Sequence, residues 1–168
     1  PPKRSRASEL TVHQNPPAHM NLITNTGGGD CLFLACAQGI NEVTKREKPV
    51  THRMLRASIC KTFESKPSQY KPFWDEKCPS SNEEPCNSWE EYISKLKKVG
   101  AWGGHLEMHA IAALYNVQIN VLTPGGVCNT VNEKSDTAIY LWLKGKHYEL
   151  LQGAHPTAWI QDLRAAAY

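Results

Sequence analysis

The chain has 168 residues, of which 40% are hydrophobic, and its 19 basic and 16 acidic side chains give a net charge of +3. This length supports one domain with a real core. The chain has no apolar run long enough to span a bilayer and no basic-then-apolar leader, so we expect no membrane association. The basic residues form no dense stripe, so we expect no nucleic acid as partner.

The chain starts at Pro1 without a methionine, which suggests a domain cut from a longer polypeptide. We expect this domain to be monomeric. Residues 1–20 are predicted to form an irregular lead-in, and residues 21–168 a single domain. The apolar run CLFLACAQGI, which starts at Cys31, predicts a buried helix that ends near Gly39. Since GGGD precedes this run, Cys31 is expected at a loop-to-helix junction.

Two further helices are predicted from caps and apolar spacing. Thr51 is expected to cap a helix that runs to about Ser65, with an apolar face at residues 55, 59 and 63. Ser88 and the glutamate three positions later form a capping box for a helix through about Val99. The four prolines of residues 66–87 predict a long connection without regular helix.

The pattern of residues 104–151 predicts one helix followed by strands. Residues 104–115 have helical spacing, and the alternating VQINVL at 117–122 predicts a strand. After a turn at 123–126, a strand at 138–143 leads through a glycine-centred turn into HYELL, which predicts a hairpin. We therefore expect an α+β fold with a small, mainly antiparallel sheet covered by helices.

Six cysteines are present, at positions 31, 36, 60, 78, 86 and 128. Their spacing matches no zinc motif, and the chain has enough apolar residues to fold without disulfides. We expect reduced thiols in a cytoplasmic protein. A zinc ion bound by residues far apart in the sequence is the less favoured alternative.

Cys31 is a candidate nucleophile because a helix N-terminus favours a thiolate, and glycine N–H groups can bind an oxyanion. His147 follows a glycine turn at the start of a predicted strand. Glu149, two residues on, shares its face and could orient the imidazole. From these residues alone, we favour the interpretation that Cys31 is a buried structural residue and His147 a surface residue.

Three sequence blocks resemble the ovarian tumour (OTU) cysteine proteases, which act as deubiquitinases. They are GGGDCLFLA around Cys31, WGGHLEMHAIAALYNVQINVL at 102–122 and HYELL at 147–151. The resemblance covers about residues 22–151, and it reverses the preference just stated. It implies a papain-type fold in which residues 21–168 are the catalytic domain.

The resemblance assigns Cys31 as nucleophile, His147 as general base and Glu149 as the residue that orients the histidine. Gly28, Gly29 and Asp30 match the oxyanion loop, whose donors would be the N–H groups of Cys31 and of Gly28 or Gly29. Trp102, Gly103 and Gly104 match a helix start beside the substrate channel, for which a purely architectural role is the stronger interpretation.

Two positions depart from the family pattern. Gly28 stands where the family usually has an aspartate, and Glu149 stands where aspartate or asparagine is commoner. Asp30 adds negative charge beside Cys31 unless its side chain points away. These departures suggest that the activity is reduced or lost.

The resemblance implies a thiol isopeptidase that releases ubiquitin or a ubiquitin-like modifier through a thioester, with no metal and no cofactor. Tyr70, Phe73 and Trp74 are candidate anchors for the modifier, or else they only hold their loop to the core. One alternative is a ubiquitin-binding domain with a degenerate site. A polyprotein-processing protease is another.

Overall fold

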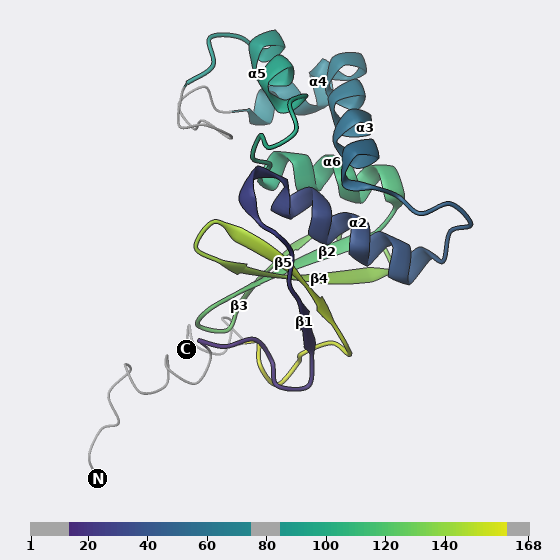
Figure 1. The fold of residues 1–168 in the computed structure, drawn as a ribbon, viewed down its shortest axis with the longest axis vertical. Coiled ribbons are helices and arrows are strands. Elements are labelled where there is room, and N and C mark those ends of the chain that lie inside the picture. The colour runs from purple at the N-terminus through teal and green to yellow at the C-terminus, as the bar shows by residue number, and fades with distance from the viewer. Residues whose placement is uncertain (1–13, 75–84, 161–168) are drawn as a thin grey trace.

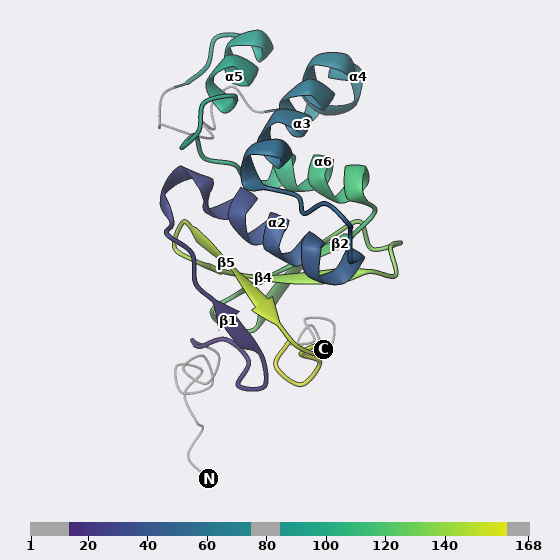
Figure 2. The same cartoon turned by 45° about the vertical axis from the view of Figure 1, so that its right-hand side comes forward.

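The computed structural model describes residues 14–74 and 85–160. In these ranges a single sheet is covered on one face by helices, with α2 lying directly on the strands and α3 and α6 next above it (Figure 1). After a turn of the molecule, the helices are again seen on one side of the sheet (Figure 2). The helical segments are η2 Gly28–Asp30, α2 Cys31–Thr44, α3 His52–Ser65, α4 Pro67–Tyr70, η3 Lys71–Phe73, α5 Trp89–Leu96 and α6 His105–Tyr115.

The sheet has five strands in the order β1-β5-β4-β2-β3. Three of its neighbouring pairs are antiparallel, and only β2 and β4 run parallel, so the predicted α+β fold with a mainly antiparallel sheet is confirmed. The strands are β1 Asn21–Ile23, β2 Gln118–Thr123, β3 Val127–Val131, β4 Ala138–Lys144 and β5 His147–Gln152. Of the three strands that were predicted, all are present.

Sequence reasoning missed β1 and β3. The three residues of β1 are too few to show an alternating pattern, and pairing with β5 defines this strand. The sequence of β3, VCNTV, has polar residues at its centre. Hydrogen bonding to β2 across the turn at 124–126 makes it a strand, so the predicted turn closes a β2–β3 hairpin.

The predicted end of the first helix near Gly39 was wrong, because α2 continues to Thr44. Gly39 is buried where α2 crosses the sheet. A Cβ on it would lie 3.1 Å from Leu150 Cδ1 and 3.2 Å from Ile139 Cγ2. This glycine therefore lets the helix lie close to β4 and β5, and Lys45, in a left-handed conformation, ends the helix instead.

The two predicted helix caps are present. Thr51 Oγ1 accepts a hydrogen bond from the Met54 N–H at 3.1 Å, and the predicted apolar face of α3 is buried. Ser88 Oγ accepts from the Glu91 N–H at 3.1 Å. Helix α5 ends at Leu96, three residues before the predicted end, because the chain turns there towards Gly100, which has a positive φ of 93°.

The expectation that residues 66–87 contain no regular helix was wrong for their first part, which forms α4 and η3. Pro67 is the first residue of α4, and Pro72 is the second residue of η3. A proline at these positions breaks no helical hydrogen bond, because the first N–H groups of a helix have no partner within it. Cys78, within the same stretch, lies outside the described residues.

Apolar residues pack on both faces of the sheet. The larger cluster joins the helices to one face, and a smaller cluster on the other face contains Met20, Leu122, Trp142 and Leu151. Trp159 lies edge-on to Trp142 with ring centroids 5.7 Å apart.

The described residues 14–20 form turns and bends before β1, and the predicted boundary at residue 20 stays a prediction. No helix of the described ranges has the length and apolar character to cross a bilayer.

Candidate active site

Cys31 is the first residue of α2 and is only 2% exposed. Its thiol lies against the start of β5, since Sγ is 3.8 Å from the Lys146 carbonyl oxygen and accepts the Tyr148 N–H at 3.5 Å. These two groups flank His147 on either side. The fold thus brings together residues separated by more than a hundred positions, and an N–H directed at sulfur is complementary to negative charge there.

The imidazole of His147 lies between an acid and the loop that precedes Cys31. His147 Nε2 is 3.8 Å from Glu149 Oε2, which is an ion-pair contact when the histidine is protonated but is longer than a hydrogen bond. The opposite ring edge faces Gly27, because a Cβ on Gly27 would lie 3.1 Å from Cε1 and 3.3 Å from Nδ1. Nδ1 therefore lies beside the loop that precedes Cys31.

The side chains of His147 and Glu149 differ in exposure, at 36% and 15%. Both residues belong to β5, where side chains alternate between the faces: Tyr148 and Leu150 contact the helix-side cluster, and Leu151 the opposite one. The alternation of side chains along β5 therefore confirms the prediction that His147 and Glu149 share a face.

The loop before Cys31 holds the predicted oxyanion residues. Gly27 and Gly28 have φ of 73° and 66°, a region that favours glycine. Gly28 is exposed and Gly29 is buried. The Cys31 N–H donates to the Gly28 carbonyl in this structure, so it would have to leave that partner to bind an oxyanion. The oxyanion roles stay predictions.

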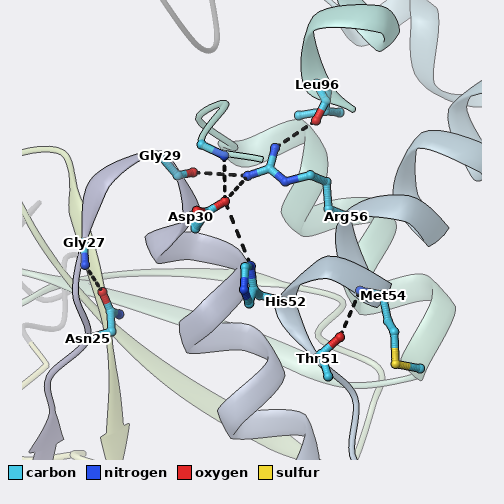
Figure 3. Close-up of polar contacts among 10 residues, drawn as sticks. Asn25, Gly27, Gly29, Asp30, Thr51, His52, Met54, Arg56 and Leu96 are labelled. Atoms are coloured by element: carbon cyan, nitrogen blue, oxygen red, sulfur yellow. Dashed lines mark hydrogen bonds and ion pairs between the residues drawn. The ribbon is translucent and has the colours of Figure 1, made fainter. Parts of the chain in front are cut away.

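Asp30 pairs with Arg56 of α3 (Figure 3), whereas the Cys31 thiol contacts β5. Asp30 Oδ1 lies 2.7 Å from Arg56 Nη2 and accepts the Gly100 N–H at 2.9 Å. Burial raises the pKa of Asp30, but these hydrogen bonds and the charge of Arg56 outweigh burial and hold that pKa below its ordinary value. Asp30 therefore braces the loop.

Two residues of this arrangement, Arg56 and Asn25, were missed. Asn25 Oδ1 accepts the Gly27 N–H at 2.9 Å, and its Nδ2 donates to the Tyr148 carbonyl at 2.9 Å (Figure 3 draws the first bond). This side chain ties the loop to β5. The signal was an asparagine two positions before a glycine, which is typical of an Asx turn.

Gly103 lies beside the first turn of α2, since a Cβ on it would be 3.0 Å from Leu32 and Phe33 side-chain atoms. The Gly104 N–H donates to Glu107 Oε2 at 3.3 Å, and the buried Glu107 also accepts from the Tyr92 hydroxyl. Burial raises the pKa of Glu107. These contacts favour an architectural role, and a channel role for Trp102–Gly104 stays a prediction.

The three aromatic residues proposed as anchors differ in their surroundings. Trp74 packs on Trp89 and Tyr92, each at 5.8 Å between centroids, and Tyr70 packs on Phe63 at 5.1 Å. Phe73 is 78% exposed. Trp74 thus holds its segment to the core, and Phe73 is the one of the three that is free to meet a partner.

Metal-ligating side chains do not gather in the part of the chain that the structure describes: no group of three or more His, Cys, Asp or Glu residues could hold an ion. The five described cysteines are free thiols. Burial raises the pKa of Cys36 far above its ordinary value, and that of Cys60 to about 11, so neither is suited to act as a nucleophile.

A family model described as an OTU-like cysteine protease matches residues 26–153. The OVARIAN TUMOR DOMAIN-containing deubiquitinating enzyme 10 of Arabidopsis thaliana is 30% identical over 97 residues, which are 58% of this chain and 23% of that protein. The chain thus spans less than a quarter of the length of this relative.

Solved structures share the fold. An ovarian tumour (OTU) domain in complex with ubiquitin has a TM-score of 0.59 and 22% identity, over 79% of this chain and 69% of that one. An OTU deubiquitinase from Wolbachia pipientis wMel bound to ubiquitin has a TM-score of 0.61 and 18% identity, over 81% and 97% of the two chains. At these identities the likeness establishes the fold.

Proposed function

The chain belongs to the OTU-like cysteine protease family, and we propose that it is a thiol isopeptidase that releases ubiquitin, or a ubiquitin-like modifier, from protein lysines. The Arabidopsis relative is named as a deubiquitinating enzyme, and OTU domains of the same fold have been solved with ubiquitin bound. The observation that carries the proposal is the position of the Cys31 thiol against the two backbone groups that flank His147.

In the proposed reaction, His147 Nδ1 takes the proton of Cys31, and the thiolate attacks the carbonyl carbon of the modifier's C-terminal glycine. A C–S bond forms and negative charge moves to the oxygen, where N–H groups of the glycine loop would bind it. Collapse breaks the C–N bond, and His147 gives its proton to the leaving lysine amine. This leaves a thioester and a free lysine.

Water then attacks the thioester carbon while His147 accepts a proton from the water. The C–S bond breaks, the modifier leaves with a free carboxylate, and the thiolate is restored. Throughout, Glu149 would hold the imidazole and stabilise its protonated form through the 3.8 Å contact. No step needs a metal or a cofactor.

The test is reaction with ubiquitin that carries an electrophile in place of its C-terminal carboxylate, followed by intact-mass measurement. One covalent adduct on Cys31 is expected, with none for Cys31→Ala or His147→Ala. Cleavage of diubiquitin by the parent chain, and not by Cys31→Ala, would complete the evidence. An adduct on another cysteine would contradict the assignment.

A second function, ubiquitin binding without catalysis, is favoured by two features of the site. The His147–Glu149 contact is longer than a hydrogen bond, and the Cys31 N–H is held by the Gly28 carbonyl. Calorimetric titration with unmodified ubiquitin separates the two functions, because a binding domain gives heat of binding but no adduct and no cleavage.

We further propose that the domain acts as a monomer in the cytoplasm, as part of a longer protein. Within the described residues the five cysteines are free and four of them are buried, which supports a reducing compartment. Fluorescence microscopy of the tagged parent protein tests the location, and light scattering of the purified domain tests its oligomeric state.

A further inference from the structure

Arg56 is a buried cation on α3, only 2% exposed, and it contacts the two residues that precede Cys31 (Figure 3). Nη2 pairs with Asp30 Oδ1 at 2.7 Å and donates to the Gly29 carbonyl at 3.4 Å. The guanidinium also lies 4.3 Å from the ring centroid of Phe33, in the first turn of α2. A buried charge is costly unless it is paired, so this position calls for an acid.

The same guanidinium connects the loop to the C-terminal end of α5. Nη1 donates to the Leu96 carbonyl at 2.8 Å, and the Gly100 N–H reaches the same Asp30 oxygen at 2.9 Å. Three stretches that are distant in sequence therefore meet at one carboxylate. Asp30, the residue directly before Cys31, is therefore held in place from the side of α3.

The charge on Asp30 matters because this residue is adjacent to Cys31. A nearby anion opposes formation of a thiolate, and a cation placed on that anion cancels the effect. Two positive or titratable groups face the Asp30 carboxylate from α3: Arg56, and His52, whose Nδ1 is 4.0 Å from Oδ1. Since hydrogen bonds hold the pKa of Asp30 low, its charge persists at neutral pH.

We propose that Arg56 is a positioning residue for Cys31: it draws the Asp30 carboxylate to the α3 side of the loop and balances its charge, so that the thiol ionises without an opposing neighbour. The inference deepens the proposed hydrolase and rests on it for its catalytic meaning. A role in folding alone would leave the ionisation of Cys31 unaffected by these charges.

The test measures the rate of iodoacetamide alkylation of Cys31 against pH, by mass spectrometry of its peptide in the whole chain. Arg56→Met leaves Asp30 unbalanced and should raise the midpoint pH of alkylation by about one unit. Asp30→Asn leaves Arg56 unbalanced and should lower it. The double variant should return to the parent midpoint, and Arg56→Lys, which keeps the charge, should stay near it.

Opposite shifts for the two single variants support the proposal, whereas unchanged midpoints, or shifts of the same sign, overturn it. Circular dichroism checks that each variant is folded. If Arg56→Met does not fold, Asp30→Asn and Arg56→Lys still decide, since a missing downward shift in Asp30→Asn overturns the proposal. The other titratable groups that act on Cys31 or lie beside it are His147, Tyr148 and Glu149 on β5 and Cys36 on α2, and they are the same in all variants.

Alkylation needs no ubiquitin, so the two proposals can fail separately. A parent chain that does not cleave ubiquitin but shows the opposite shifts would refute the proposed function and retain the charge balance. A parent chain that cleaves ubiquitin while its midpoints do not move would refute only the role of Arg56. In an active chain, Arg56→Met should also lower kcat at neutral pH, with recovery at higher pH.

Discussion

Gly29 and Gly100 meet through their backbones: a Cβ added to Gly29 would lie 1.5 Å from the Gly100 carbonyl oxygen. No side chain fits in that space, and the atom in the way belongs to backbone and cannot rotate aside. The approach fixes the distance between the loop that ends at Cys31 and the segment after α5, with the Asp30–Gly100 hydrogen bond beside it.

Gly29→Ala should therefore displace the loop. We expect the free energy of unfolding to fall by about 3 kcal/mol and kcat/KM for a fluorogenic ubiquitin substrate to fall about 100-fold, since small displacements of a nucleophile have large effects. Urea denaturation and steady-state kinetics measure the two quantities.

The matched control is Gly28→Ala. A Cβ on Gly28 would meet no atom within 4 Å, but its φ of 66° disfavours alanine by about 1 kcal/mol. The structure thus predicts a smaller loss of stability for Gly28→Ala than for Gly29→Ala. An equal loss in both variants would mean that the backbone at Gly100 moves aside at little cost, and that its contact with Gly29 does not fix the loop.

Asn25→Ala removes both hydrogen bonds that tie the loop to β5, and we expect a loss of about 2 kcal/mol in the free energy of unfolding together with a lower kcat. Asn25→Asp keeps an acceptor for the Gly27 N–H but places a carboxylate oxygen against the Tyr148 carbonyl. It should therefore be no more stable than Asn25→Ala. Full recovery in Asn25→Asp would show that the bond to Tyr148 contributes nothing.

The parts of the fold that depend on neighbouring residues could be predicted from the sequence. The caps at Thr51 and Ser88 involve atoms three residues away, and the shared face of His147 and Glu149 follows from the period of a strand. The length of α2 could not be predicted in this way, because Gly39 lies inside the helix where it packs on Ile139 and Leu150, which are at least a hundred residues further along the chain.

The candidate site shows the same division. That Cys31 lies beside His147 was implied by the family resemblance, and no spacing in the chain required it. Arg56 and Asn25 were missed because each contacts the loop across the fold: Arg56 is 26 residues from Asp30, and Asn25 is 123 residues from Tyr148. Polar contacts at such separations leave no periodic pattern in a single sequence.

Glu149→Ala should lower kcat roughly 10-fold with little change in KM, because the histidine loses its partner but keeps its place at the end of β5. The expected effect is small for an orienting acid, since the contact is 3.8 Å long and His147 is partly exposed. Glu133→Ala, an exposed acid between β3 and β4, is the control and should leave kcat unchanged. A loss of a thousandfold would indicate that the contact shortens when substrate binds.

His105 and His109 on α6, whose rings meet edge to face, give a prediction about pH. Their Nε2 atoms are 3.0 Å apart, and partial burial, then the charge of His105, lowers the pKa of His109 below 6.5. The unfolded chain, with the ordinary pKa, gains this proton first as the pH falls, so stability decreases on acidification below about pH 6.5.

His109→Gln removes that titration, and its melting temperature should fall less than the parent's between about pH 7.5 and pH 5.5. His19→Gln, which leaves the α6 pair intact, should keep the parent's dependence. Differential scanning calorimetry at both pH values makes the comparison. If His109→Gln lost as much stability on acidification as the parent, the proton uptake would have to belong to other groups, and the close approach of the two imidazoles would have no effect on stability.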